Sequence, residues 1–290
     1  MLALLRTIRP RQWVKNVFVA APVVFSRHLE DHTYLARAAL AVAAFCLLSG
    51  AVYAYNDVHD VAADRMHPTK KHRPIAAGEL SERAALVWSA VLATVALASC
   101  FALHWQLAMW AGLYLVQNVA YSLRLKHVAF VDVALLASGF LLRVLAGAAA
   151  IAVPASGWLL ACTALLALFL GLGKRAHELA WSRDSGSNHV TRAALSGYNL
   201  AVVRPVMYVL AIATCAAYVA YTLEPHAIEL FGTRDLVYSA PFVALGIARF
   251  LSLSLWSPRI DSPTDAMLRD PWFLLDLLAA TATVLYIIYG

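Results

Sequence analysis

Charged residues are scarce in this chain of 290 amino acids: Asp, Glu, Lys and Arg together make up 14% of it, whereas soluble domains carry about 25%. Hydrophobic residues make up 62%, and the mean hydropathy is +0.68. This composition excludes an ordinary soluble domain and predicts an integral membrane protein. Arginines interrupt the short apolar patch between Met1 and Arg11, so we expect no cleavable secretory signal there and insertion through internal spans.

Cysteine is sparse as well, and the four cysteines are scattered. Cys46, Cys100, Cys162 and Cys215 each stand alone in an apolar segment, without the close pairing of a metal site or a redox pair. A glycine-rich phosphate loop, a nucleophile elbow and a His-Glu-x-x-His motif are also missing. We therefore expect the cysteines to be small core residues.

The long apolar runs have the length of membrane-spanning helices, roughly 20 residues each. They predict about nine such helices, without a linker or composition break that would divide the chain. We expect one domain over residues 1–290, an all-α polytopic bundle around a central cavity that faces the cytoplasm. The expected spans are 14–28, 37–58, 83–103, 105–123, 130–152, 155–173, 198–222, 236–256 and 272–290.

The distribution of Lys and Arg orients these spans. With a cytoplasmic N-terminus and an outer C-terminus, eighteen of the 23 basic residues fall on the inner side and three on the outer side, as the positive-inside rule requires. The net charge of +6 is thereby explained by a membrane face, and no nucleic-acid partner is expected.

Acidic residues gather where the second span ends, on a helix expected to continue from residue 37 to residue 64. Asn56, Asp60 and Asp64 lie four residues apart, within roughly 80° on one helical face, and Asp57 flanks them. Such oxygen ligands suit Mg²⁺, which binds one or two carboxylates together with phosphates and water. Carboxylates at a helix C-terminus oppose the helix dipole, which favours a positive partner there. The alternative is a solvated helix end.

Basic residues follow the acids at once. Pro68 is expected to end the helix, and the loop behind it carries Lys70, Lys71 and Arg73. Pro74 stiffens the backbone beside Arg73, which favours a fixed guanidinium that binds phosphate. Ordinary positive-inside residues are the alternative.

The loop between the fourth and fifth spans repeats this combination of charges. The topology places this loop and the inner end of the sixth span on the same side of the membrane as the acidic residues, where we expect the three segments to converge. Tyr121, Ser122, Lys126 and Asp132 bracket it, and a phosphate site would use Lys126 as a point charge and Asp132 for a second metal or for orienting a base. The alternative is an interfacial Tyr with a snorkelling Lys. Arg143 lies about three turns after Asp132, deep in the bilayer, where an Arg lines a cavity or pairs with an acid.

Two further segments carry candidate substrate-binding residues. Lys174, Arg175 and Glu178 stand at the inner end of the sixth span, as a phosphate grip or as a helix-end charge pair. Near the N-terminus, the candidates either fix a lipid headgroup or form an interfacial anchor of Trp and Lys. They are Arg9, Gln12, Trp13, Lys15 and Asn16.

These motifs, in this order, resemble the UbiA superfamily of intramembrane prenyltransferases and, within it, the decaprenyl-phosphate phosphoribosyltransferase branch. The resemblance extends to about residue 180; beyond it the chain matches only as hydrophobic helices. The matching residues are Arg9-Pro-Arg-Gln-Trp-Val-Lys-Asn16, Asn56-Asp57-x-x-Asp60-x-x-x-Asp64-x-x-His67-Pro68-x-Lys70-x-x-Arg73-Pro74-Ile75-Ala76-x-Gly78, Tyr121-Ser122-x-x-Leu125-Lys126, Asp132, Gly139-Phe140-x-x-Arg143 and Gly173-Lys174-Arg175-x-x-Glu178.

The resemblance implies Mg²⁺-dependent transfer of the phosphoribosyl group from phosphoribosyl diphosphate to a polyprenyl phosphate, for cell-wall arabinan precursors, at the cytoplasmic face of a bacterial plasma membrane. We expect catalytic roles for Asp60, Asp64, Lys126 and Asp132. The expected metal ligands are Asn56, Asp57, Asp60 and Asp64. The expected substrate-binding residues are Lys15, Asn16, Lys70, Arg73, Tyr121, Ser122, Arg143, Lys174, Arg175 and Glu178.

One departure from the wider superfamily bears on the substrate. Members that use a prenyl diphosphate typically carry a second aspartate-rich motif, whereas Asp132 has no acidic companion four residues away. This favours phosphoribosyl diphosphate over the alternative, an aromatic prenyltransferase that joins a prenyl diphosphate to a quinone precursor. A non-enzymatic cation carrier is disfavoured, because carrier sites lie near the midplane of the membrane. A homo-oligomer is left open.

Overall fold

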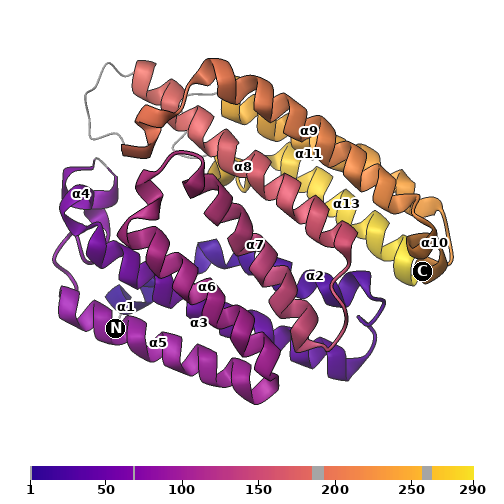
Figure 1. Ribbon diagram of the computed structural model, residues 1–290, viewed down its shortest axis with the longest axis horizontal. Coiled ribbons are helices and arrows are strands. Elements are labelled where there is room, and N and C mark those ends of the chain that lie inside the picture. Colours follow the sequence, from indigo (N-terminus) through magenta and orange to yellow (C-terminus); the bar gives the residue numbers. More distant parts are fainter. Residues whose placement is uncertain (1, 68, 185–192, 257–262) are drawn as a thin grey trace. The chain divides into compact units, whose positions relative to one another are not determined.

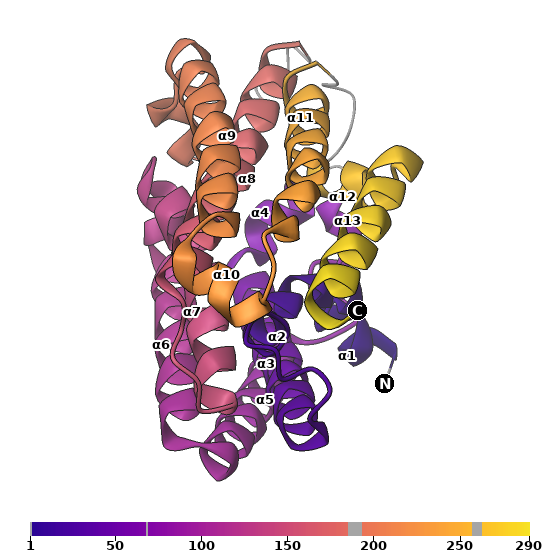
Figure 2. The ribbon, with the colours of Figure 1, turned by 90° about the vertical axis from the view of Figure 1, so that its right-hand side faces the viewer.

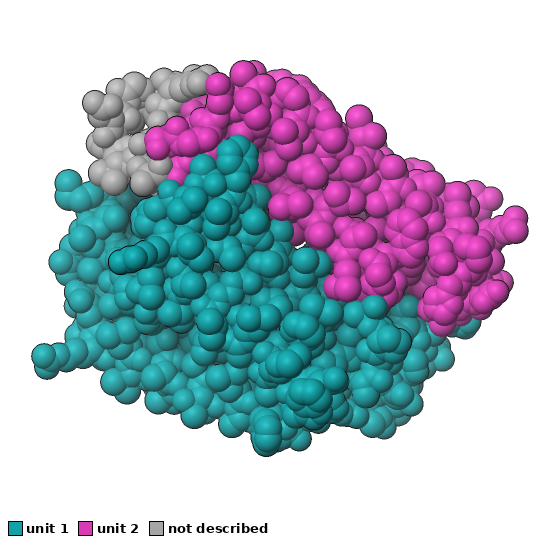
Figure 3. Space-filling view, viewed as in Figure 1, with its two compact units in different colours: residues 1–155 teal, residues 156–290 magenta. Residues whose placement is uncertain are grey.

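The computed structural model describes residues 2–67, 69–184, 193–256 and 263–290. The chain divides into two compact units, Met1–Ala155 and Ser156–Gly290 (Figure 3). Every regular element within the described ranges is a helix. Pro68, and the Arg192 and Arg259 that enter the count of inner cations, lie outside the described residues.

Unit 1 is a bundle built around the long helix α3 (Figure 1). Helix α3 packs against α5, α6, α7 and α2, and α2 packs mainly on α7. Its elements are α1 (Leu2–Thr7), η1 (Pro10–Asn16), α2 (Val17–Phe25), α3 (His32–His59), α4 (Val61–Met66), η2 (Lys70–His72), α5 (Glu82–Leu103), α6 (Trp105–Leu123), η3 (Leu125–His127) and α7 (Val131–Ala150).

Small side chains let these helices approach closely, as in other membrane bundles. Alanines of α3 and α7 fill much of the core around Phe45 and Leu48. At Gly147 of α7 an added Cβ would lie 1.9 Å from the carbonyl oxygen of Val19 in α2. The helices α2 and α7 therefore touch at the level of their backbones.

Unit 2 pairs α8 with α9 and places α11 against α8, α9 and α13 (Figure 2). Phe169 and Phe250 meet edge to face, 5.2 Å apart, and a Cβ at Gly173 would lie 2.3 Å from the Phe250 ring. Gly173 thus has a packing role. The elements are α8 (Gly157–Asp184), η4 (Ala193–Gly197), α9 (Leu200–Thr222), α10 (Pro225–Phe231), η5 (Asp235–Ser239), α11 (Ala240–Trp256), α12 (Pro263–Met267) and α13 (Pro271–Tyr289).

Seven helices in the described part of the chain are long and apolar enough to cross a membrane, which confirms a polytopic helical membrane protein. They include α3, α5, α7, α8, α9 and α13, and α11 together with η5. Two expected spans differ. Residues 14–28 form the end of η1 and the nine-residue helix α2. The expected span at 105–123 is helix α6, in which Gln106, Gln117 and Asn118 lower the hydropathy.

The expected continuous helix from residue 37 to residue 64 is wrong at both ends. Helix α3 begins earlier, at His32, where the Asp31 carboxylate accepts a hydrogen bond from the Thr33 amide at 2.8 Å. It ends at His59, and Asp60 joins it to the separate short helix α4. The Asp64 amide still donates to the Asp60 carbonyl at 2.8 Å, so the backbone bends at Asp60 without losing this hydrogen bond.

Candidate active site

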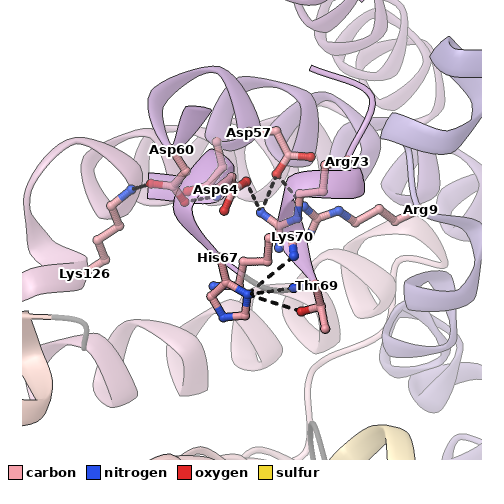
Figure 4. A network of polar contacts seen from close by, with 10 residues as sticks. Arg9, Asp57, Asp60, Asp64, His67, Thr69, Lys70, Arg73 and Lys126 are labelled. Carbon is pink, nitrogen blue, oxygen red and sulfur yellow. Dashed lines mark hydrogen bonds and ion pairs between the residues drawn. The ribbon is translucent and has the colours of Figure 1, made fainter. Parts of the chain in front are cut away.

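The acids at the end of α3 and in α4 meet basic side chains from three other segments of unit 1 (Figure 4). One Asp60 oxygen accepts from the Lys126 ammonium, which η3 carries, and the other accepts from the Asn56 amide at 2.8 Å. Lys126 is almost buried, with 6% of its side chain exposed. The sequence prediction that Lys126 lies near the acidic cluster is thus borne out by this contact.

Asp57 and Asp64 share a second set of basic partners. Arg73 donates from Nη1 to Asp57 Oδ1 at 3.0 Å and to Asp64 Oδ2 at 2.6 Å. Arg9, from the turn between α1 and η1, donates to the same Asp57 oxygen. The three carboxylates of the cluster are therefore balanced by three cations, Arg9, Arg73 and Lys126.

The loop after α4 is folded so that it fixes Arg73. His67 Nδ1 accepts from the Thr69 amide at 3.3 Å, which turns the chain after α4. The Arg73 carbonyl accepts from the Ala77 amide at 2.8 Å, and Ile75 is buried. Gly78 adopts φ +78°, a left-handed conformation that glycine enters without strain. Arg73 thus stands on an ordered loop, as the adjoining proline predicts.

Burial raises the pKa of the Asp64 carboxyl, and the neighbouring Arg73 guanidinium opposes that rise. Low-dielectric surroundings disfavour a charge unless a partner compensates it. Ion pairing therefore keeps charged groups in this buried part of unit 1, and any anion or cation that enters must exchange with an existing partner.

The oxygen donors present fit a magnesium ion. Asn56 and Asp60 are already joined one helical turn apart, and Asp60 is 21% exposed at its side chain. Among the described residues no three His, Cys, Asp or Glu side chains form a metal-holding group by themselves. Mg²⁺ needs no such group, because it commonly takes one or two carboxylates and completes its shell with phosphate and water.

Arg143 forms a second polar cluster, inside the bundle of unit 1. Its Nε donates to Asn16 Oδ1 at 2.9 Å, its Nη1 to the Gly139 carbonyl at 2.9 Å and its Nη2 to the Tyr114 hydroxyl at 2.8 Å. Ser49 also donates to the same Asn16 oxygen. The alternative of an acidic partner is not seen among the described residues: the guanidinium donates to neutral groups and lies 4.6 Å from the centre of the Tyr114 ring. A substrate-binding role for Arg143 stays a prediction.

The other predicted residues of unit 1 lie at helix ends. Tyr121 and Ser122 form the last turn of α6, with Ser122 buried. Asp132 is fully buried in the first turn of α7, where a carboxylate suits the positive end of the helix dipole. Lys15 is partly exposed in η1.

Lys174, Arg175 and Glu178 belong to unit 2, on α8. Arg175 has no exposed surface and pairs with Glu178 one turn further on, as the helix-end alternative proposes. Their convergence on the acidic cluster stays a prediction.

The sequence did not predict the contact of Arg9 with Asp57. The only signal was an arginine before a proline at the start of the first matching motif, Arg9-Pro10. Forty-eight residues separate Arg9 from Asp57, so no helical periodicity links them.

Residues 17–268 match the model of the UbiA prenyltransferase family, and the chain belongs to that family. It is 36% identical, over 96% of its own length and 92% of the relative, to the decaprenyl-phosphate phosphoribosyltransferase of Mycobacterium tuberculosis (strain CDC 1551 / Oshkosh). It is 32% identical to the protein of that name from Mycolicibacterium smegmatis, over 99% and 92% of the two chains.

A solved structure has the same fold. The UbiA homolog from Archaeoglobus fulgidus bound to DMAPP and Mg2+ superposes with a TM-score of 0.73 over 98% of each chain, at 18% identity. The all-helical architecture expected from the sequence is thereby confirmed.

Proposed function

We propose that this protein transfers a phosphoribosyl group from phosphoribosyl diphosphate to a polyprenyl phosphate, with Mg²⁺ and with release of diphosphate. The proposal is supported by the names of relatives that match nearly the whole chain. The observation that carries it is the cluster in which Asp57, Asp60 and Asp64 are paired with cations. Such a cluster offers carboxylates to a metal and cations to phosphates at the same time.

Asn56 and Asp60 would hold the metal, and Asp64 lies one turn further on for a bridging water or a direct contact. When bound, the metal supplies positive charge that stabilises the departing diphosphate. Lys126, released from Asp60, then donates to a phosphate oxygen. Arg73 does the same from its rigid loop, where its planar fork suits two oxygens of one phosphate.

The reaction needs no strong base in this scheme. The lipid phosphate is already anionic near neutral pH, and one of its oxygens forms the new bond to ribose C1. The bond between C1 and the diphosphate oxygen breaks, and the electron pair leaves with the diphosphate. The task of the chain is to orient both phosphates and to stabilise the charge of the leaving group with preorganised cations.

We further propose that α2 and α6 complete nine spans around a cavity that opens to the cytoplasm of a bacterial plasma membrane. The N-terminus would then lie inside and the C-terminus outside. This orientation is supported by the excess of Lys and Arg in the segments assigned to the inner face. The cations of the acidic cluster lie in those same segments.

One assay tests the proposal. Purified protein receives Mg²⁺ with labelled phosphoribosyl diphosphate and a polyprenyl phosphate, or instead a labelled prenyl diphosphate with 4-hydroxybenzoate. We expect labelled lipid in the first reaction, dependent on Mg²⁺ and lost with EDTA. Label transfer in the second reaction alone would replace the proposal by an aromatic prenyltransferase, and transfer in neither would remove both.

A further inference from the structure

Asp57 is placed unlike a metal ligand. Its carboxylate is 2% exposed, and a single oxygen, Oδ1, accepts from both Arg9 and Arg73. The two arginine side chains are 26% and 24% exposed. A solute that reaches this part of unit 1 therefore meets the two guanidinium groups, while the carboxylate between them is covered.

The chain holds Arg9 in a costly conformation. Arg9 has φ +48° and ψ +66°, in the left-handed region that residues other than glycine rarely adopt. Such conformations persist only where the surroundings enforce them, and they concentrate at functional sites. Its planar group also lies over the ring of Tyr53, 5.1 Å from the centre.

Hydrogen bonds of residues before and after Arg9 hold the backbone in this conformation. Before it, Arg6 donates to Glu79 at 2.6 Å and to the His72 carbonyl at 3.0 Å, which ties α1 to the loop that carries Arg73. After it, the fully buried Asn16 is held by Arg143 and Ser49. The turn is thus fixed against the same loop and the same helix that its guanidinium approaches.

We propose that Asp57 is a positioning residue that holds Arg9 and Arg73 as a pair of guanidinium groups for one phosphate-bearing substrate, and that Arg9 is a further phosphate-binding residue of the site. The inference rests on the proposed function and adds a residue to it. In the described part of the chain, Arg9 donates to Asp57 from Nη2 alone, so its other N–H groups can donate to a ligand, and paired guanidinium groups match the oxygens of a diphosphate. The N-terminal segment becomes part of the active site.

The first test measures binding and needs no turnover. Full-length protein in detergent is titrated with inorganic diphosphate in the presence of Mg²⁺, as wild type, Arg9→Gln, Arg9→Lys and Arg11→Gln. Arg11 is the matched control, because it lies in the same segment, is exposed and has no hydrogen bond or ion pair among the described residues. Melting temperatures identify variants that fail to fold.

We expect Arg9→Gln to weaken diphosphate binding about tenfold or more, the loss of one charge-assisted contact. Arg9→Lys keeps the charge but not the planar, forked guanidinium, so its affinity for diphosphate should lie between those of Arg9→Gln and the wild type. Arg11→Gln should have the affinity of the wild type. Equal affinity of folded Arg9→Gln and Arg11→Gln would overturn the role of Arg9. If Arg9→Gln does not fold, wild-type affinity in Arg9→Lys overturns it instead.

The second test separates a positioning residue from a metal ligand. In Asp57→Asn we expect KM for phosphoribosyl diphosphate to rise while the Mg²⁺ concentration for half-maximal activity stays unchanged. A raised Mg²⁺ requirement with an unchanged KM would make Asp57 a ligand and end the inference. If only the proposed function is wrong, the result is distinguishable. The wild type would still bind diphosphate in a manner that depends on Arg9, but it would transfer no phosphoribosyl group to the lipid.

Discussion

Two membrane-spanning helices, α7 of unit 1 and α13 of unit 2, carry a charged residue in opposite surroundings. In unit 1 the buried Arg143 makes three hydrogen bonds from a membrane-spanning helix. In unit 2 the span α13 carries Asp276, whose Oδ1 is buried and has no hydrogen bond or ion pair within the described residues. A wholly apolar groove between α9 and α11, lined by Ala211, Cys215 and Ala248 among others, lies in the same unit.

This contrast shows in which parts of each unit buried polar residues have hydrogen-bond partners. Polar groups in hydrocarbon are costly unless they are satisfied, and around Arg143 unit 1 satisfies them in a network that joins several of its elements. The acidic cluster continues this pattern at the C-terminal end of α3, in α4 and in η3. Unit 2 presents mainly apolar helix faces, α13 most of all. We therefore expect substitutions in the polar clusters of unit 1 to cost both activity and stability, and substitutions in α13 of unit 2 to act on stability alone.

The largest effect is expected at Asp60. Asp60→Asn removes the charge that would hold the metal and leaves the Lys126 ammonium buried without its ion-pair partner. Turnover should fall to about 1% of wild type or less, and the free energy of unfolding should drop by about 3 kcal/mol or more. The double variant Asp60→Asn with Lys126→Met should regain the stability, read by thermal melting, but not the turnover. Near-wild-type turnover of the single variant would take Asp60 out of the mechanism.

The next effect concerns the backbone contact in unit 1. Gly147→Ala places a methyl group 1.9 Å from the Val19 carbonyl oxygen, so α2 and α7 must separate, at a cost of about 3 kcal/mol or more. Gly112→Ala in α6 is the matched control, because nothing lies within 4 Å of its added Cβ; it should be neutral or stabilise by up to about 1 kcal/mol. Equal melting temperatures for the two variants would contradict the close approach.

A substitution in unit 2, Asp276→Leu, should stabilise the protein instead of destabilising it. Asp276→Leu removes an unsatisfied carboxyl from α13 and should raise the free energy of unfolding by about 1 to 3 kcal/mol, without changing turnover. Thermal melting in detergent and the transfer assay measure the two quantities. A loss of activity with preserved folding would show that unit 2 also places a polar group for chemistry.

The smallest effect is a pH dependence at the start of α13. The hydrogen bond from Arg249 lowers the pKa of Asp270 below its ordinary value of 3.8, and the Phe273 amide adds to it. A lowered pKa contributes stability that is present above this ordinary value and is lost as the pH falls below it. Melting temperatures between about pH 5 and pH 3 should therefore fall more steeply for the wild type than for Asp270→Asn. Parallel curves would mean that the pair contributes nothing measurable.

The sequence predicts the class of fold and the chemical character of the site well. Composition and span length identify a helical membrane protein, because hydrophobicity is a local property that a window of residues reveals. The spacing of Asn56 and Asp60 correctly predicts that they meet, since four residues make about one helical turn. The topology alone predicts that Lys126 lies near this helix, but it does not predict the ion pair with Asp60.

Contacts between distant segments could not be predicted in this way. Arg143 meets Asn16 across 127 positions of sequence, and the sequence suggests an acid instead because burial of a cation normally calls for one. Several neutral dipoles can replace that acid, and their arrangement depends on the packed backbone. The bend at Asp60 escaped prediction for a similar reason, because no proline or glycine marks it.

The contact of Gly147 with Val19 also bears on how the protein is made. Helix α2 has nine residues, about 14 Å of helix against a hydrocarbon core of roughly 30 Å, so it can complete a span only together with η1 and with the helices on which it packs. The helix on which it mainly packs, α7, leaves the ribosome more than a hundred residues later. Helix α2 can pack on α3 soon after synthesis, but its larger contact, with α7, forms only after the fifth expected span has been made, so the core of unit 1 closes late.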